Sequence, residues 1–388
     1  MKMELNKEKL FIIWRTPVLT FVLLVFIYLY LSKTGFNPLE FGLAKNMHSV
    51  EQSFIDGHLV QASSSEIEVW KNALPNNTDS VNRLIVWTGN SHLHAINNYK
   101  DGQQPAAFHL HKLLNGNKWP GKYPVLGISY PNISFFEQFL LTLFLCVEEA
   151  LPHPLIIVNG YRYADTRENT LREIIKPILY NTKVNRWILE NHERLKNKYP
   201  LALKRLQNEI NVKISKRESI NIRENIGDSK ISEIIGNFVP LFNNRNAING
   251  IIRTSIRSVR DFVFNIDSTS KRPILMSRYK EAMEFMELAS EVSKMNNTYL
   301  LIYNIPLRPV ADNPYPASDY SKYCNDMRAI AKKYAANVYF LDYENVIPVE
   351  LWGYYDSGQP DFAHFKEEGH ILFARKLEGE LSALGLLR

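Results

Sequence analysis

A serine near the start of the chain and an aspartate-histidine pair near its end have the residue types of an acyl-transfer site. Ser91 lies two residues after Gly89, and Asp361 precedes His364 by three residues. An imidazole can take the proton of a serine hydroxyl, and a neighbouring carboxylate can hold that imidazole in the required orientation. The order serine, aspartate, histidine therefore predicts a nucleophile, an orienting group and a base, provided that folding brings the two ends of the chain together.

The residues around Ser91 indicate how it would be positioned. The short apolar run 84–87 is typical of a strand, and Gly89 permits a tight turn from that strand into a helix. A hydroxyl at a helix start lies near backbone N–H groups that can stabilise an oxyanion. The alternative is that Ser91 only caps the following helix. The aspartate-histidine pair favours the catalytic interpretation, because we expect it at the start of the terminal helix 365–379.

The rest of the body alternates short apolar runs with helical patterns, which predicts an α/β fold with a parallel sheet covered on both faces. The strand signal disappears between 166 and about 297, so we expect a helical insertion there, with helices at 187–210 and 279–294. A further helix is expected at 63–71. The expected strands are 84–87, 124–128, 155–158, 298–303 and 338–341, and the amphipathic run 134–149 is expected to be a helix.

An apolar segment close to the N-terminus predicts a membrane anchor. Residues 10–32 contain a single charged residue, Arg15, and reach the roughly 20 residues that a helix needs to span a bilayer. Basic residues are more frequent before this segment than directly after it, which favours a cytoplasmic N-terminus and an exported body. A cleavable signal peptide is the alternative, but the stretch is long for one and no small-residue cleavage site follows it. We therefore expect a single-pass anchor in the lipid bilayer of the cell membrane.

Composition and charge argue against several other classes. The chain has 388 residues, a net charge of +6 and 45% hydrophobic residues, which is enough for one large domain with insertions or two small ones. Its basic residues are not interleaved with aromatic ones, so no nucleic-acid partner is expected. The two cysteines lack the spacing of a metal site, and one disulfide between them stays an alternative. The histidine pairs at 92 and 94 and at 109 and 111 have no matching carboxylate cluster, so no metal or other cofactor is expected.

The two motifs resemble sequence blocks of the SGNH/GDSL hydrolases. Residues 89–92 resemble the Gly-Asp-Ser opening block of that family, with Asn90 in place of the aspartate. Residues 361–370 are similar to its closing block, including the glycine five residues after the histidine. The resemblance covers 84–163 and 298–388, so the predicted anchor and the helical insertion lie outside it.

The resemblance implies a flavodoxin-like three-layer α/β/α fold and ester chemistry, in which Ser91 is the nucleophile, His364 the general base and Asp361 its orienting carboxylate. The family's two middle blocks differ here. Asn132 stands nearest to the second-block glycine, and Arg162 replaces an asparagine amide with a guanidinium that keeps its charge. We expect Ser91, Asn132 and Arg162 to bind the oxyanion. The residues expected to bind substrate, from their positions in these blocks or at the carboxyl edge of the sheet, are Asn90, His92, Gly160 and Arg308.

These expectations combine into one function and one alternative. An outward-facing anchored body suits chemistry on cell-envelope polymers, and it resembles in architecture the membrane-anchored SGNH proteins that act beside multi-pass membrane O-acyltransferases. We therefore expect a serine acyltransferase or esterase that acts on an O-acyl group of an envelope polysaccharide. The alternative is a catalytically silent SGNH-fold protein that binds an envelope glycan or serves as a scaffold for a membrane acyltransferase. The expected organisation is a cytoplasmic tail 1–9, the anchor 10–32, a tether and packing segment 33–80, and the SGNH-like domain 81–388.

Overall fold

The computed structural model describes most of the chain beyond residue 46, apart from a long central segment and several shorter ones. The described residues are 47–74, 83–115, 123–149, 151, 155–168, 170–221 (the backbone alone for 211–221), 270–309, 313–355, 358 and 360–387. Nearly all of them belong to one compact unit, 43–219 together with 266–388. The predicted anchor at 10–32 lies outside the described residues. Within them, no helix is both long and apolar enough to cross a bilayer.

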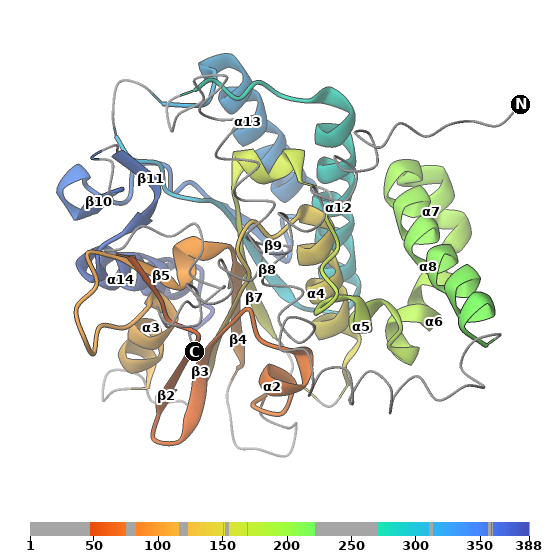
Figure 1. Cartoon of the computed structure of the whole chain (residues 1–388), viewed down its shortest axis with the longest axis horizontal. Coiled ribbons are helices and arrows are strands. Elements are labelled where there is room, and N and C mark those ends of the chain that lie inside the picture. The colour runs from red at the N-terminus through yellow and green to blue at the C-terminus, as the bar shows by residue number, and fades with distance from the viewer. Residues whose placement is uncertain are drawn as a thin grey trace, which may run out of the picture. The chain divides into compact units, whose positions relative to one another are not determined.

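A mostly parallel sheet of seven strands forms the centre of this unit (Figure 1). Its order in space is β2-β3-β6-β4-β7-β8-β9, and every neighbouring pair is parallel except β2 with β3. The prediction of an α/β fold with a parallel sheet is therefore confirmed. The strands are β2 (Gln52–Ile55), β3 (His58–Ser63), β4 (Ile85–Gly89), β6 (Val125–Ser129), β7 (Ile156–Tyr161), β8 (Tyr299–Asn304) and β9 (Val338–Leu341).

Helices cover both faces of the sheet, so its strands are buried on both sides. Ile85 and Trp87 of β4 belong to one apolar cluster, and Val86 between them belongs to another. This alternation follows from the two-residue period of a strand. In Figure 1 the helices of the two clusters lie on opposite sides of the sheet, which is compatible with a three-layer α/β/α fold. The first cluster contains α3 (Ala106–Leu114) and α14 (Glu367–Ala383); the second contains α4 (Phe135–Val147), α12 (Met276–Met295) and α13 (Ala317–Lys333).

The segment predicted as a helical insertion divides into two parts. Asn191 separates two short helices and Pro200 begins the next, so the single helix predicted at 187–210 is interrupted. The C-terminal part, α12, packs against α4 and leads directly into β8, so α12 belongs to a layer of the main fold. The helices before it are α5 (Lys176–Leu179), α6 (Thr182–Glu190), α7 (His192–Lys198) and α8 (Pro200–Asn221).

Strands outside the five predicted apolar runs were not anticipated. Two of them, β2 and β3, lie in the segment expected to be a tether and extend the sheet at one edge. The helix predicted at 63–71 is shorter, α2 (Ile67–Lys71), because Ser63 ends β3. Two antiparallel pairs lie outside the main sheet. They are β1 (Met47–Ser49) with β5 (Ala95–Asn97), and β10 (Trp352–Tyr354) with β11 (Pro360–Phe365).

The expectation that Asp361 and His364 stand at the start of a helix 365–379 is wrong. Both residues lie on β11, and α14 begins only at Glu367. The strand forms because β10 pairs with it, with Trp352 opposite Phe365. The two strands follow each other in the chain and form a hairpin, which the three-residue spacing of Asp361 and His364 does not by itself indicate.

All loops that follow the parallel strands emerge at one edge of the sheet. The strand that precedes Ser91, β4, lies between β6 and β7, so the loops after these three strands are neighbours. The sheet therefore brings the side chains of these loops together at its carboxyl edge, as expected for open α/β folds.

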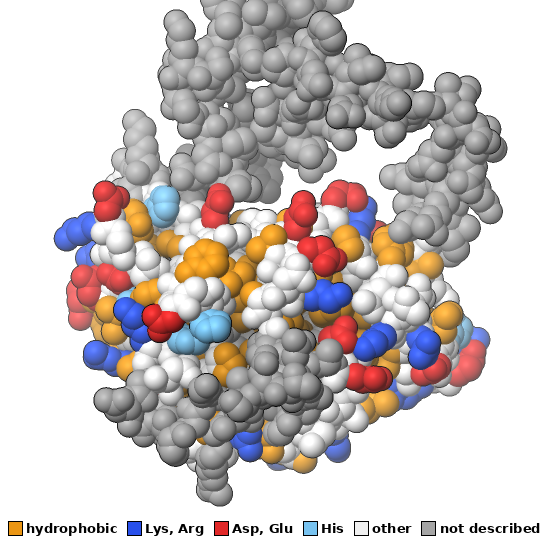
Figure 2. All heavy atoms as spheres, turned by 90° about the horizontal axis from the view of Figure 1, so that it is seen from below, with side chains coloured by type: hydrophobic (Ala, Val, Ile, Leu, Met, Phe, Trp, Pro, Cys, Tyr) orange, Lys and Arg blue, Asp and Glu red, His pale blue; other side chains and the backbone are white. Residues whose placement is uncertain are grey.

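The surface carries both signs of charge: among the described residues visible in Figure 2, basic and acidic side chains are interspersed with hydrophobic ones.

Candidate active site

Ser91 is positioned by a tight turn at the end of β4. A side chain at Gly89 would place its Cβ only 2.7 Å from His92 Cε1 and 2.9 Å from Leu93 Cδ1, so the turn requires glycine there. The turn leads into a short 3-10 helix, η2 (Ser91–Leu93), and the Asn90 side chain caps it by accepting from the backbone N–H of His92. Ser91 is therefore the first residue of η2, and its N–H has no partner within that helix.

His364 and Asp361 approach Ser91 from β11, which lies against η2. The His364 Nε2 atom lies 2.9 Å from Ser91 Oγ, and the His364 Nδ1 atom lies 3.0 Å from Asp361 Oδ2. Only 8% of each of Ser91 and His364 is exposed, and Asp361 is fully buried. The structure thus brings the predicted serine, histidine and aspartate into one line of contacts across 273 residues of sequence.

Several hydrogen-bond donors fix the carboxylate of Asp361. Its Oδ1 atom accepts from the backbone N–H groups of Ala363 at 2.8 Å and His364 at 3.1 Å, and its Oδ2 atom accepts from Asn97 Nδ2 at 3.0 Å as well as from the imidazole. Burial alone would raise the pKa of Asp361, but the interaction with His364 and these hydrogen bonds outweigh burial and lower the pKa below its ordinary value. Asp361 is therefore ionised at neutral pH.

The charge of Asp361 determines the tautomer of His364. An ionised carboxylate only accepts hydrogen bonds, so His364 Nδ1 carries the proton and His364 Nε2 presents a lone pair. The Ser91 hydroxyl then donates to Nε2. This is the proton arrangement that a serine nucleophile requires before it attacks.

His92 is not exposed to a substrate, contrary to the prediction that it binds one. It is fully buried, its Nδ1 atom lies 2.6 Å from Asn90 Oδ1, and its Nε2 atom lies 2.7 Å from the Tyr303 hydroxyl. Burial lowers the pKa of His92 well below its usual value, so the ring is neutral: it donates from Nδ1 and accepts from Tyr303. Tyr303 in turn accepts from Trp87 Nε1 at 2.9 Å.

Asn90 continues this buried chain on the other side and is also only 1% exposed. Its Nδ2 atom donates to Asp165 Oδ2 at 2.9 Å. Arg162 donates to the other oxygen of Asp165, from Nε at 3.1 Å and from Nη2 at 2.6 Å. Asn90 therefore supports the turn that holds Ser91, while the fully buried Asp165 holds Asn90 and Arg162 together.

The two side chains predicted to bind an oxyanion contact each other. Arg162 Nη2 donates to Asn132 Oδ1 at 2.6 Å, and the two residues follow β7 and β6 on either side of β4. This contact leaves the Asn132 Nδ2 group as a donor, and Asn132 has the positive φ of 51° that asparagine tolerates. Burial would lower the pKa of Arg162, but Asp165 raises it, so the guanidinium stays charged. Arg162 is thus placed to orient Asn132.

Two further predicted substrate-binding residues have other contacts. Gly160 is buried because the ring of Tyr303 occupies the space where a side chain would lie, and its carbonyl accepts from Gln138 Nε2 at 2.8 Å. Arg308 is 3% exposed, donates to the carbonyl of Gly353 in β10 and lies 4.3 Å from the ring centre of Tyr354. The structure therefore assigns Gly160 to packing and Arg308 to support of β10.

Several residues of the site were missed or undervalued in the sequence. Asn97 and Tyr303 gave no signal, because their contacts with Asp361 and His92 connect distant segments. Tyr355 was also missed. It hydrogen-bonds to Asp361, and burial together with this carboxylate raises its pKa. Asp165 was noticeable as a polar residue after a strand, but its burial could not be inferred.

Two other histidines lie close to the triad. Burial lowers the pKa of His94 to about 3, and it lowers the pKa of His370 to about 3 as well. The His94 Nδ1 atom lies 2.8 Å from Ser129 Oγ, and the His370 ring packs 4.5 Å from the ring of Phe365. Both rings are neutral at physiological pH, so they add no charge that would oppose protonation of His364.

Metal and disulfide chemistry find no support in the described part of the chain. No cluster of three or more His, Cys, Asp or Glu side chains that could hold a metal occurs among the described residues. Cys146 and Cys324 are both buried and unpaired, so the alternative of a disulfide between them is wrong.

Comparison with known proteins assigns no relative to the chain: no protein-family model matches it, and no curated protein is significantly similar to it.

Proposed function

We propose that this chain is a serine acyltransferase or carboxylic ester hydrolase with Ser91 as its nucleophile. The observation that carries this proposal is the line of contacts from Ser91 Oγ to His364 Nε2, at 2.9 Å, and from His364 Nδ1 to Asp361 Oδ2, at 3.0 Å. Both distances suit proton transfer by a base whose orientation is fixed. The low exposure of all three side chains supports the same conclusion, because hydrogen bonds and charges act more strongly where water is excluded.

In the proposed reaction Ser91 Oγ attacks the carbonyl carbon of an ester, and its proton passes to His364 Nε2. Asp361 stabilises the resulting imidazolium. The Ser91 N–H and the Asn132 Nδ2 group donate to the oxyanion, while Arg162 keeps Asn132 in place. When the oxyanion collapses, the alcohol leaves with the proton from His364, and the acyl group remains on Ser91. An incoming hydroxyl then gives its proton to His364 and takes the acyl group, and His364 returns that proton to Ser91 Oγ as the bond between Ser91 and the acyl group breaks.

The identity of that incoming hydroxyl separates the two activities. Water gives ester hydrolysis, and a sugar hydroxyl gives O-acyl transfer. We propose an O-acyl group of a cell-envelope polysaccharide as the substrate, with the chain held in the membrane by residues 10–32 and its body outside the cytoplasm. A multi-pass membrane O-acyltransferase is the proposed partner. These parts of the proposal rest on the sequence.

We also propose that the fold is flavodoxin-like and related to the SGNH hydrolases. Five of the six parallel strands, β6-β4-β7-β8-β9, have the chain order 2-1-3-4-5 among themselves, which is that of flavodoxin-like sheets, and β3 adds a sixth parallel strand beside β6. Ligands of such sheets bind beyond the carboxyl ends of the strands at the point where the order reverses. Here that point is between β4 and β7, and Ser91 and Arg162 follow these strands.

A serine-directed fluorophosphonate tests the proposal on the full chain. We expect wild-type protein to be labelled at Ser91, and we expect Ser91→Ala and His364→Ala to abolish labelling. The exposed residues Ser382 and His58 provide matched controls, since Ser382→Ala and His58→Ala make the same changes away from the site. Labelling that persists in Ser91→Ala would contradict the assignment of the nucleophile. In cells, Ser91→Ala should lower the acylation of envelope polysaccharide.

A catalytically silent scaffold is the second candidate, and one observation favours it. The guanidinium of Arg162, which stands where the resemblance implies an oxyanion-binding asparagine, is held by Asp165 and Asn132. A scaffold would show no fluorophosphonate labelling, and Ser91→Ala would leave polymer acylation unchanged while deletion of the whole chain altered it.

A further inference from the structure

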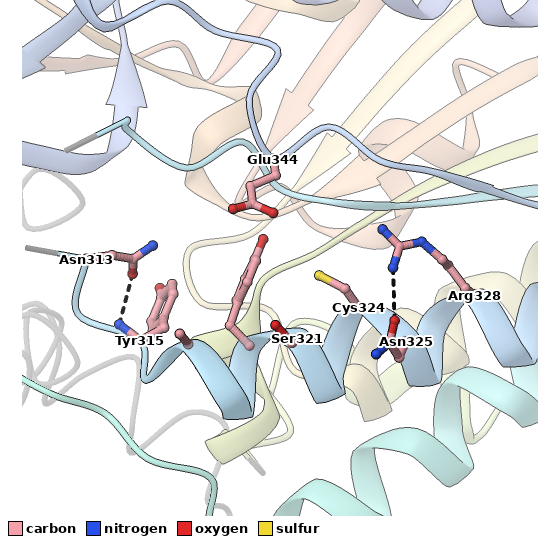
Figure 3. A pocket seen from close by; sticks show the side chains of 9 residues that line it. Asn313, Tyr315, Ser321, Cys324, Asn325, Arg328 and Glu344 are labelled. Atoms are coloured by element: carbon pink, nitrogen blue, oxygen red, sulfur yellow. Dashed lines mark hydrogen bonds between the residues drawn. The ribbon is translucent and has the colours of Figure 1, made fainter. Parts of the chain in front are cut away.

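A pocket lies at the carboxyl edge of the sheet, between α13 and the loop after β9. Its volume is about 350 Å³, which is at the lower end of the range for small-molecule sites. Figure 3 shows Glu344 on one side of it, opposite Ser321, Cys324 and Asn325 of α13. The side chains that line it belong to Asn313, Tyr315, Ala317, Tyr320, Ser321, Cys324, Asn325, Arg328 and Glu344.

The lining combines aromatic surface with groups that form hydrogen bonds. The Tyr315 and Tyr320 rings are nearly parallel, at 9°, with their centres 5.9 Å apart, and both residues are largely buried. Asn313 accepts from the Tyr315 N–H and Asn325 accepts from Arg328, so each amide keeps its NH₂ group as a donor. Ser321 adds an exposed hydroxyl. Such a surface suits a ligand with apolar faces and many hydroxyl groups.

The charges of the pocket disfavour an anionic ligand. Among the described residues that line the pocket, Arg328 is the one cation, and it forms an ion pair with Asp342; Lys271 lies beside the lining and donates to the carbonyl of Asn313. Glu344 has no hydrogen-bond or ion-pair partner for its carboxylate among the residues that the structure describes. Burial and the charge of Asp342 raise its pKa and outweigh Arg328, which lowers it, so the carboxylate charge is on balance poorly stabilised by its surroundings. A ligand that donates hydrogen bonds to this carboxylate would relieve that cost, whereas a phosphate or carboxylate group would be repelled.

Tyr355 and Arg162 connect the triad to this pocket along the edge of the sheet. Tyr355 hydrogen-bonds to Asp361 and interacts with the charge of Arg162, and Tyr315 of the pocket interacts with that same charge. The strand before Glu344, β9, is three strands away from β4, the strand before Ser91, so these two strands are about 14 Å apart at normal strand spacing. A single small ligand in the pocket would therefore not reach Ser91, but an extended chain would.

We propose that this pocket binds a neutral, hydroxyl-rich glycosyl unit of the acceptor, and that the acceptor is an oligosaccharide chain extending from the pocket to Ser91. This inference rests on the function proposed above, because the hydroxyl that takes the acyl group belongs to the same oligosaccharide that the pocket binds. Glu344 accepts hydrogen bonds from sugar hydroxyls, the amide groups of Asn313 and Asn325 donate to them, and the tyrosine pair contacts the apolar face of the ring.

The test of this site measures acyl transfer by the full chain, kept soluble in detergent, to acceptors that have been separated according to their charge. The probes are oligosaccharides released from the envelope of the source cell and separated by anion exchange into a neutral and an anionic pool, with p-nitrophenyl acetate as donor. We expect transfer to the neutral pool. Ser321→Leu, which fills the pocket, should raise the KM for that pool at least tenfold. Glu344→Gln should raise the KM about tenfold, because it removes one hydrogen bond to a charged group. Ser318→Leu, on the exposed side of α13, is the matched control.

Two further readouts separate failure of this inference from failure of the proposed function. Fluorophosphonate labelling and the hydrolysis of p-nitrophenyl acetate by water should be the same in Ser321→Leu, Glu344→Gln and the wild type. Preference for the anionic pool, or an unchanged KM in Ser321→Leu, would overturn the pocket assignment while leaving the serine chemistry intact. If the wild type is not labelled, ligand-observed NMR with the neutral pool still decides: binding that Ser321→Leu abolishes supports the site, and absence of binding by the wild type refutes it.

Discussion

Replacement of Asp361 by asparagine should remove most of the activity without removing the side chain's volume. The asparagine oxygen can take the place of Oδ1 and accept the same two backbone N–H groups, from Ala363 and His364. Its NH₂ group then stands where Oδ2 was, facing His364 Nδ1 and Asn97 Nδ2. It donates to His364 Nδ1, so the imidazole proton moves to Nε2, and Nε2 can no longer accept the proton of Ser91.

The size of this effect follows from the loss of the correct tautomer and of a negative charge beside the imidazolium. In a serine protease with the same arrangement, the equivalent change lowers the rate roughly 10⁴-fold. For Asp361→Asn we expect a fall of about 10³- to 10⁴-fold, equivalent to about 4–5.5 kcal/mol in the activation free energy. The facing NH₂ groups of residues 361 and 97 should also destabilise the fold by about 1–3 kcal/mol.

The assay is the second-order rate constant of fluorophosphonate labelling, measured together with denaturant unfolding at the same pH. Asp56→Asn is the matched control, because Asp56 is exposed in the turn between β2 and β3 and has a positive φ that asparagine also adopts. The control should label at the wild-type rate. A folded Asp361→Asn variant that labels within threefold of the wild type would refute the argument that Asp361 fixes the tautomer of His364.

Three further predictions concern the surroundings of the triad. Asn132→Gly keeps the left-handed backbone but removes the amide, so kcat should fall about 10²-fold, whereas Asn297→Gly, at another exposed left-handed position, should leave kcat unchanged. Tyr303→Phe leaves two buried groups, Trp87 Nε1 and His92 Nε2, without a hydrogen-bond partner. Denaturant titration should therefore show that the free energy of unfolding falls by about 2–4 kcal/mol, and a fall below about 0.5 kcal/mol would contradict these buried hydrogen bonds. Burial lowers the pKa of His370 to about 3, so the unfolded chain binds a proton that the folded chain refuses, and stability falls as the pH drops below about 6.5. His370→Leu should therefore lose about 1.2 kcal/mol less than the wild type between pH 6 and pH 5, and an unchanged pH slope would show that His370 is protonated in the folded state.

The sequence predicted five of the six parallel strands, because each of these five is a buried apolar run, and it missed β3. The bounds of β9 agree with the predicted 338–341, and β7 and β8 extend slightly beyond their apolar residues. The hairpin of β2 and β3 carried a local signal that was overlooked: Asp56 and Gly57 both have positive φ in the turn between them, as expected for an Asp-Gly pair. The β10–β11 pair is also a local hairpin, with Tyr354 opposite Pro360, and the positive φ of Gly358 between the two strands is a turn signal that was overlooked as well.

For the site, residue type and motif spacing were enough to select the serine, the aspartate and the histidine. They were not enough to distinguish residues that face a substrate from residues that support them. Asn90, His92 and Gly160 lie beside the nucleophile in sequence or in a neighbouring block, yet each is buried in internal contacts. Asn97, whose amide fixes Asp361, is 264 residues away from it, and no local pattern relates the two.

The separation of Ser91 and His364 has a consequence for how the protein is made. His364 is synthesised 273 residues after Ser91, and α14, which follows His364, must pack against α3. Arg83, just before β4, also donates to the carbonyl of Leu386 at 2.7 Å. A chain that is still being translated therefore carries a serine without its imidazole partner, and the proposed chemistry begins only after residues 361–387 have packed against the earlier part of the fold.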